Sequence, residues 1–237
     1  ETVGNPGLDV LDIPTVSAIA HEAGVPLLVD STLTSPYLIR PFEHGADLVY
    51  HSATKFLSGH GTVIGGVVVD GGSFDWEASG KFAELTQAYD GFHNMVFSEE
   101  STVGAFLLRA RREGLRDFGA AMSPHTAWLI LQGIETLPLR MERHISNTEK
   151  VVRFLAAHPF VSRVGHPLLE SHPSHALANQ LLRHGAKGAG AVFSFDLKGN
   201  RAQGKAFIEA LKLFSHLANV GDCRSLVIHP ASTTHFR

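Results

Sequence analysis

The chain has 237 residues, of which 44% are hydrophobic and 18% are charged, and its net charge is −3. This composition is typical of a folded globular domain. It excludes a disordered or collagen-like chain and a polybasic surface for nucleic acid or membranes. The one cysteine, Cys223, cannot form an internal disulfide, which is typical of proteins of the reducing cytosol. We therefore expect a cytoplasmic protein whose partners include neither nucleic acid nor a membrane.

Both ends of the sequence have the character of internal segments. The chain begins with Glu1 rather than with methionine, and it ends just after the conspicuous run His-Pro-Ala-Ser-Thr-Thr-His at 229–235. No apolar run approaches the ~18 residues of a membrane-spanning helix, and no signal peptide opens the chain. We expect the 237 residues to be part of a longer protein.

The first third of the chain alternates between helix and strand signals. Pro14 and the apolar spacing after it predict a helix that stops at Gly24. Short apolar runs predict three strands, at 25–29, 46–51 and 65–69. Between the first two strands, residues 41–45 predict one helical turn. Strand, helix and strand at this spacing indicate a parallel or mixed α/β sheet.

The remainder of the chain divides into three stretches. Residues 71–97 are rich in glycine, serine and aromatic residues and predict a long excursion with one short helix at 76–83. Apolar spacing predicts a helix over 102–118. Ser123-Pro124 opens a predicted helix over 124–157, which Pro138 divides. From His158-Pro159 onward the pattern is that of a different α+β unit, with expected strands 160–164, 191–197 and 225–228 and an expected helix 202–214. We therefore expect one domain over 1–119 and a second over 120–237.

A lysine directly after a predicted strand is the strongest chemical signal. Ser52-Ala53-Thr54-Lys55 follows the strand at 46–51. Ligands of open α/β sheets bind outside the carboxyl ends of the strands, where hydroxyls and backbone N–H groups suit a phosphate. Desolvation there lowers the pKa of a lysine and makes its amine nucleophilic. The alternative is a surface lysine in a turn.

Two further polar residues follow predicted strand ends at similar spacing. Asp30 ends the first strand, and a buried carboxylate needs a cation, such as a protonated pyridine nitrogen. Its alternative is an Asx turn or a helix N-cap. Asn5 precedes Pro6, which commonly marks a turn, but at a strand end its amide can donate a hydrogen bond to a phenolate oxygen.

Together these motifs resemble one enzyme family along the whole chain. Glu-x-x-x-Asn-Pro at 1–6, Val-Asp-Ser-Thr at 29–32 and His-Ser-Ala-Thr-Lys-Phe at 51–56 resemble the cystathionine γ-synthase family of pyridoxal-phosphate enzymes of sulfur amino-acid metabolism. The resemblance implies an α/β protein of fold type I. Its large domain holds a mostly parallel sheet, which this chain contains in part, with an insertion at about 71–97. A smaller α+β domain follows it.

Several segments are most similar to the O-acetylhomoserine sulfhydrylase branch of the family, namely 40–47, 74–82, 114–119 and 131–144. Asn219 stands where lyases of the family carry serine, which also favours this branch. The resemblance implies γ-replacement of the acetoxy group of O-acetyl-L-homoserine by sulfide, giving L-homocysteine and acetate in methionine biosynthesis. The open alternatives are a cystathionine γ-synthase, a γ-lyase, or a fragment without activity.

The resemblance also implies which residues bind the ring of pyridoxal 5′-phosphate. Lys55 would form a Schiff base with the cofactor and later transfer protons. Asp30 would pair with the pyridinium nitrogen, Thr32 would lie against the ring face, and Asn5 would contact the phenolic oxygen.

Other residues would serve the phosphate and the substrate. Ser52 and Thr54 would hold the phosphate, and Asn219 and Val220 would help bind the carboxylate of an amino-acid substrate. The family's phosphate loop and ring-stacking tyrosine would lie before Glu1, and its carboxylate-clamping arginine after Arg237. The resemblance also implies a homotetramer built from dimers. The 15 histidines show no metal-ligand spacing, so we expect no metal.

Overall fold

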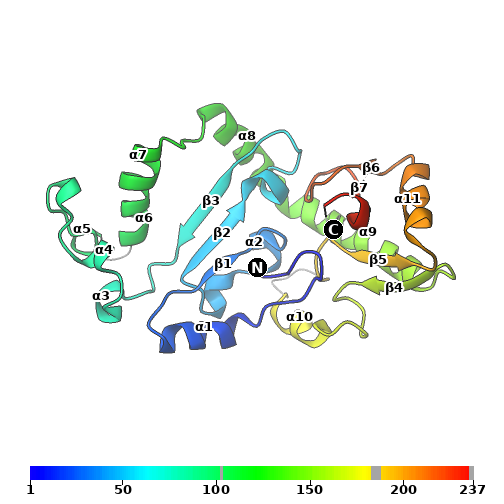
Figure 1. The fold of residues 1–237 in the computed structure, drawn as a ribbon, viewed down its shortest axis with the longest axis horizontal. Coiled ribbons are helices and arrows are strands. Elements are labelled where there is room, and N and C mark those ends of the chain that lie inside the picture. The colour runs from blue at the N-terminus through cyan, green and yellow to red at the C-terminus, as the bar shows by residue number, and fades with distance from the viewer. Residues whose placement is uncertain (102–103, 183–187, 235–237) are drawn as a thin grey trace.

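The computed structural model describes residues 1–101, 104–182 and 188–234, and its centre is a three-stranded sheet in the order β1-β2-β3 (Figure 1). The strands are β1 (Leu28–Asp30), β2 (Leu48–Ser52) and β3 (Gly66–Asp70). β1 and β2 are parallel, and β3 runs antiparallel to β2. The mixed α/β sheet predicted from the sequence is confirmed. Because β1 and β2 are parallel, their carboxyl ends meet at one edge of the sheet.

The helix before β1 begins and ends where its sequence predicts. α1 (Ile13–Glu22) is capped by the Asp12 side chain, which accepts a hydrogen bond from the Thr15 N–H at 3.1 Å. Gly24 ends it with φ of +62°. Between β1 and β2 lie α2 (Ser35–Leu38) and the 3₁₀ turn η1 (Pro41–His44), which confirms the predicted helical turn.

The predicted excursion folds into a helical arm that extends to the left in Figure 1. Its helices are α3 (Trp76–Ser79), α4 (Ala83–Thr86), the 3₁₀ turn η3 (Asp90–Phe92) and α5 (Phe97–Glu100). Helical backbone then continues through α6 (Ala105–Arg109), the π-helical turn η4 (Ala110–Leu115) and α7 (Arg116–Phe118). The predicted helix over 102–118 is confirmed from Ala105 onward, while residues 102–103 lie outside the described residues.

Aromatic packing holds this arm together. Trp76 is buried, and its ring lies 4.9 Å from that of Phe74 and 5.1 Å from that of Phe82, both edge to face. The Phe106 ring stacks on the indole, with the ring centres 6.1 Å apart. The single short helix expected near 76–83 is therefore two helical turns, because Gly80 ends the first with φ of +63°.

Two helices lie behind the central sheet. α8 (Pro124–Glu135) begins at Ser123, whose hydroxyl accepts a hydrogen bond from the Thr126 N–H at 3.1 Å. α9 (Leu137–Ala156) begins immediately after it, with Pro138 in its first turn, so the predicted division is confirmed. Ile130, Met141 and Ile145 of these helices are buried against the segment that follows β2.

The remaining elements form two small sheets and their helices, on the right in Figure 1. β4 (Val161–Gly165) and β5 (Ser194–Leu197) are antiparallel, and β6 (Ser215–His216) and β7 (Leu226–Val227) are parallel. The other elements are α10 (His175–Leu181), α11 (Arg201–Ala210) and the 3₁₀ turn η5 (Pro230–Ser232).

Two predicted elements are shorter than expected. α11 ends at Ala210 rather than at 214, because the chain turns extended at Leu211 (φ −71°, ψ 137°) to enter β6. β5 begins only at Ser194, whereas the alternating pattern predicts strand from 191. Neither α10 nor β6 is predicted from the sequence. The end of the run at 229–235 lies outside the described residues.

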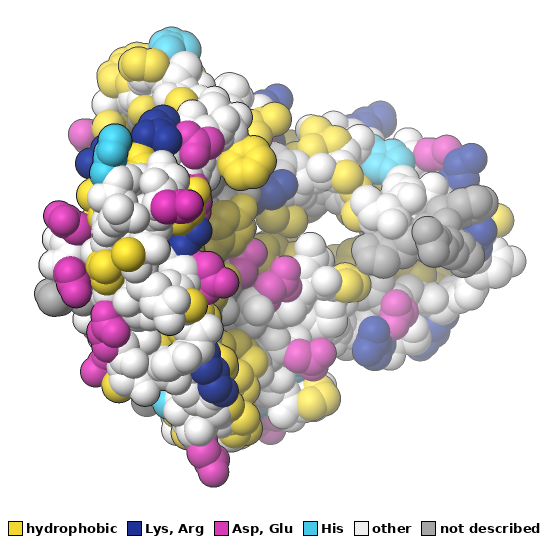
Figure 2. All heavy atoms as spheres, turned by 60° about the vertical axis from the view of Figure 1, so that its left-hand side comes forward, with side chains coloured by type: hydrophobic (Ala, Val, Ile, Leu, Met, Phe, Trp, Pro, Cys, Tyr) yellow, Lys and Arg dark blue, Asp and Glu magenta, His cyan; other side chains and the backbone are white. Residues whose placement is uncertain are grey.

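Figure 2 shows that the arm stands away from the rest of the molecule, with a hollow between them that has hydrophobic side chains on its inner wall. Among the described residues, no helix has both the length and the apolar character needed to cross a membrane.

Candidate active site

The turn after β2 presents Lys55 at the edge of the sheet. Ala53–Leu57 form a single π-helical turn, η2, in which Lys55 has non-helical backbone angles (φ −91°, ψ −123°). π-Helical turns of this kind occur frequently at functional sites. The turn is anchored in the core by the buried side chains of Phe56 and Leu57, so the backbone that carries Lys55 is fixed on the side that faces the core.

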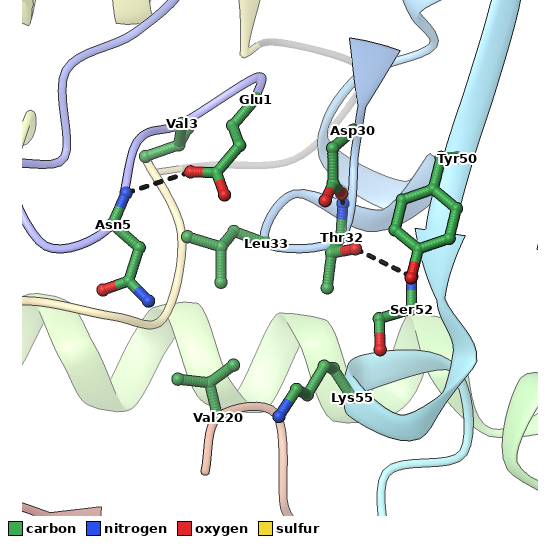
Figure 3. Close-up of a pocket in the computed structure, with 10 residues that line it drawn as sticks. All are labelled: Glu1, Val3, Asn5, Asp30, Thr32, Leu33, Tyr50, Ser52, Lys55 and Val220. Carbon is green, nitrogen blue, oxygen red and sulfur yellow. Dashed lines mark hydrogen bonds between the residues drawn. The ribbon is translucent and has the colours of Figure 1, made fainter. Parts of the chain in front are cut away.

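Lys55 points into a hollow of about 180 Å³ (Figure 3). The hollow lies where β1 and β2 end, which is the location that the sequence predicts. Its walls come from four separate segments of the chain: Glu1, Val3 and Asn5; Asp30, Thr32 and Leu33; Tyr50, Ser52 and Lys55; and Val220.

The end of β1 places a carboxylate in the same hollow. Asp30 is the last residue of β1 and pairs in register with Tyr50 of β2. Its Oδ1 atom accepts a hydrogen bond from the Thr32 N–H at 2.8 Å, and the Thr32 hydroxyl accepts one from the Ser52 N–H at 2.8 Å. These contacts fix Asp30, Thr32 and Ser52 relative to one another across the two strand ends. Asp30 thus makes the alternative Asx contact and also lines the hollow.

A loop near the C-terminus completes the lysine's surroundings. The Lys55 amine donates a hydrogen bond of 2.6 Å to Oδ1 of Asn219, 164 residues away in sequence. The same loop passes so close to η2 that a Cβ atom on Gly221 would lie 2.5 Å from the Phe56 nitrogen. The Cys223 N–H donates to the Gly59 carbonyl at 2.8 Å. Lys55 is therefore held by its own turn, η2, and by the loop at 219–223.

Most of the predicted site residues meet at this hollow. Asn5 lines the hollow across from Thr32 and Ser52, and its backbone N–H donates to the Glu1 carboxylate at 3.1 Å (Figure 3). Thr54 and Asn219 are the exceptions, because neither is among the residues that line the hollow. The Thr54 hydroxyl accepts a hydrogen bond of 3.0 Å from the Gly65 N–H, and Asn219 contacts the Lys55 amine.

Sequence reasoning missed two residues of β2 near this site. Tyr50 lines the hollow, and side-chain alternation places it on the same face as Ser52, a signal that was present in the sequence. His51, on the other face, is buried and its Nδ1 atom lies 3.1 Å from the Ser31 carbonyl. Burial lowers the pKa of His51, although the hydrogen bond to Ser31 and the charge of Asp30 oppose this shift.

An amine, a carboxylate, hydroxyls and an amide at the carboxyl ends of strands define a site for a small anionic cofactor in an α/β enzyme. The whole chain, residues 1–237, matches the family described as Cys/Met metabolism PLP-dependent enzyme. The chain belongs to this family. Two expectations from the sequence are thereby confirmed, namely the α/β fold and the family's dependence on pyridoxal phosphate.

Named relatives cover the whole chain. It is 52% identical over 99% of its length to an O-acetyl-L-homoserine sulfhydrylase of Leptospira meyeri, and 49% identical over its full length to a homocysteine synthase of Schizosaccharomyces pombe. It spans only 54% and 55% of these two proteins. The chain therefore spans about half the length of the curated relatives it matches.

Solved structures show the same architecture. A putative O-acetylhomoserine (thiol)-lyase of Campylobacter jejuni, solved with N′-pyridoxyl-lysine-5′-monophosphate, matches the whole chain with a TM-score of 0.95 at 33% identity, over 56% of its own length. A cystathionine γ-synthase of Xanthomonas oryzae, in complex with aminoacrylate and cysteine, matches 98% of the chain with a TM-score of 0.77 at 33% identity, over 51% of its length.

The residues at the hollow fit pyridoxal phosphate. The Lys55 amine has the chemistry to join an aldehyde, and the Asp30 carboxylate to hold a positive ring nitrogen. Within the described part of the chain, Oδ2 of Asp30 accepts no hydrogen bond, so this oxygen is available to a bound group. The Ser52 hydroxyl faces the same hollow and suits a phosphate.

Proposed function

We propose that the protein converts O-acetyl-L-homoserine and sulfide to L-homocysteine and acetate with pyridoxal phosphate as its cofactor. The observation that carries this proposal is that Lys55 and Asp30 line one hollow, while Asn219 accepts a hydrogen bond from the Lys55 amine. The chain is also 52% identical to a protein named for this activity. The proposal concerns the intact protein.

Each residue of the hollow has a distinct proposed task. When bound, pyridoxal phosphate supplies an electron sink for carbanion chemistry on amino acids. Lys55 would hold the cofactor covalently through its amine until the substrate's own amine takes its place, and the freed amine would then remove and return protons near the substrate's α carbon. A positioned general acid–base of this kind contributes about 10² to 10⁴ in rate. Asp30 keeps the ring nitrogen positively charged, while Thr32 lies against the ring.

The remaining contacts orient the phosphate and the substrate. We propose that Ser52 and Thr54 hold the phosphate and that Asn5 donates to the phenolic oxygen. Thr54 would reach the phosphate once its hydroxyl leaves the Gly65 carbonyl, to which it donates a hydrogen bond of 3.3 Å. Asn219 and Val220 would bind the substrate carboxylate. Asn219 then has a second contact, since it accepts a hydrogen bond from Lys55 in the absence of substrate.

Replacing Lys55 tests the proposal directly. We expect Lys55→Ala in the intact protein to lose both the absorbance of the covalent cofactor linkage and turnover of O-acetyl-L-homoserine. Lys212→Ala removes an exposed lysine outside the hollow and should keep both. If Lys55→Ala keeps the linkage and turnover, the assignment of the site is wrong.

A second candidate is cystathionine γ-synthesis, which is favoured by the structural match to the Xanthomonas oryzae enzyme. The two reactions differ in the nucleophile that replaces the acyloxy group at the γ carbon. Assays of O-acetyl- and O-succinyl-homoserine, each with sulfide and with cysteine, separate them. Homocysteine from the acetyl donor and sulfide supports the first proposal. Cystathionine as the main product supports the second, and breakdown of substrate without either nucleophile indicates a γ-lyase.

A further inference from the structure

The turn that carries Lys55 ends in backbone carbonyls that need partners. The last backbone carbonyls of a helical turn receive no hydrogen bond from an N–H group of the turn itself, so side chains or water must donate to them. The carbonyls of Phe56 and Leu57, the last two residues of η2, point toward α9 rather than toward the hollow. What meets them there decides how firmly the turn is held.

A single guanidinium group on α9 meets these carbonyls. Nη1 of Arg140 donates to the Phe56 carbonyl at 2.8 Å, and Nη2 donates to the Leu57 carbonyl at 3.2 Å. Nη2 also donates to the Gly133 carbonyl of α8 at 2.6 Å. One planar group thus joins the lysine turn to both helices behind the sheet, a geometry that the flat fork of arginine allows and a point charge does not.

The backbone approaches Arg140 and the lysine turn closely at two glycines. A Cβ atom on Gly59 would lie 2.5 Å from the Cζ atom of Arg140, and one on Gly133 would lie 2.5 Å from the Leu57 carbonyl oxygen. Nε of Arg140 is fixed in addition by the Thr136 hydroxyl at 3.2 Å. Two glycines therefore allow the helices to approach the turn closely enough for these hydrogen bonds.

Arg140 does not line the hollow, so its influence on the site must pass through the turn. Its contacts are on the residues directly after Lys55. A displacement of about 1 Å in a reacting group can reduce a rate by about 10²-fold. A contact that fixes the backbone beside the lysine can therefore control how well its amine is aimed.

We propose that Arg140 is a positioning residue that aims the Lys55 amine into the hollow by clamping the carbonyls of Phe56 and Leu57 to α8 and α9. The inference rests on the proposed role of Lys55 in binding the cofactor. It predicts that loss of the guanidinium harms the covalent linkage much more than it harms the pocket itself.

Two ligands separate these effects in the intact protein freed of cofactor. Pyridoxal phosphate joins Lys55 covalently, whereas pyridoxamine phosphate has no aldehyde and binds the pocket without that bond. For Arg140→Met we expect the rate of linkage with pyridoxal phosphate to fall at least about tenfold, with pyridoxamine phosphate affinity close to wild type. Arg143→Met, an exposed arginine on the same helix, should change neither quantity.

Unchanged linkage kinetics in Arg140→Met would overturn the proposal, and so would an equal loss for the two ligands, which indicates a general loss of structure. If this variant does not fold, Arg140→Lys gives the same comparison. It keeps the charge but cannot bridge the carbonyls as a fork, so its linkage rate should also fall selectively, and a wild-type rate would contradict the clamp. A linkage that survives Lys55→Ala would instead refute the proposed role of Lys55.

Discussion

His166 directly follows β4 and is completely buried. Its Nδ1 atom accepts a hydrogen bond from the Leu168 N–H at 3.1 Å, while its Nε2 atom has no partner among the described residues. Burial lowers the pKa of His166 from 6.5 to about 4. The folded protein therefore holds this ring neutral under conditions in which the unfolded chain protonates it, and the residue links the stability of the fold to pH.

This residue gives a signed prediction for acid stability. Because the pKa of His166 is lower in the folded state, its contribution is complete above pH 6.5 and is lost as the pH falls toward 4. Between pH 7 and 4.5 we expect a loss of about 2.5 kcal/mol in the free energy of unfolding from this group.

Urea unfolding at the two pH values measures this loss. His166→Asn keeps an acceptor for Leu168 but cannot take up a proton, so it should lose that much less stability on acidification than the wild type. His216→Asn replaces an exposed histidine and should behave as the wild type does. Identical acid sensitivity in His166→Asn and the wild type would refute the prediction.

At the scale of elements, the site depends on the contact between η2 and the loop at 219–223. Gly221 has φ of +79°, and a Cβ atom there would lie 2.8 Å from the carbonyl carbon of Lys55. Gly119 has a similar φ of +72°, yet a Cβ atom there would meet nothing within 4 Å. The two glycines share the backbone conformation and differ in what surrounds them.

This pair separates steric overlap from backbone strain. Gly119→Ala should cost only the strain of alanine in the left-handed region, about 1 kcal/mol in the free energy of unfolding. Gly221→Ala carries the same strain and also pushes the loop away from Lys55. We expect it to lower the rate of cofactor linkage by at least about tenfold. Urea unfolding and linkage kinetics measure the two effects, and equal linkage rates in both variants would contradict the prediction.

The sequence predicts some of the contacts at this site and not others. The meeting of Asp30 and Lys55 was predictable, because the carboxyl ends of parallel strands lie at one edge of a sheet. The clamp from Arg140 was not, since nothing in local sequence indicates that residues 56 and 140 approach each other. Asp47 shows the same limit. Its buried carboxylate joins the Leu27 N–H, His21 and the Ser73 hydroxyl, yet its sequence neighbours suggest only a strand.

At the scale of the whole molecule, large apolar side chains remain uncovered. Ile64 is 89% exposed, Phe118 is 87% exposed and Leu213 is 83% exposed. These side chains lie on different elements, and a hollow with apolar walls separates the arm from the rest (Figure 2). Apolar side chains scattered singly are normal on a protein surface, so the expected assembly rests on the resemblance to the family.

We expect the intact protein to assemble as a homotetramer, as the resemblance to its family implies. Apolar contacts are not screened by salt, so the assembly should persist from physiological to high ionic strength. Sedimentation equilibrium of the intact protein at both ionic strengths gives the assembly mass. A monomer at either would contradict the prediction.

The hydrogen bond between Lys55 and Asn219 also has a consequence for synthesis. The two residues are separated by 164 positions, so a ribosome adding about 5–20 residues per second needs about 8–33 s to travel from one codon to the other. During that interval the lysine turn exists without its amide partner. The site therefore cannot be completed before residue 219 has been added, and closing so long a loop adds an entropic cost that local contacts do not carry.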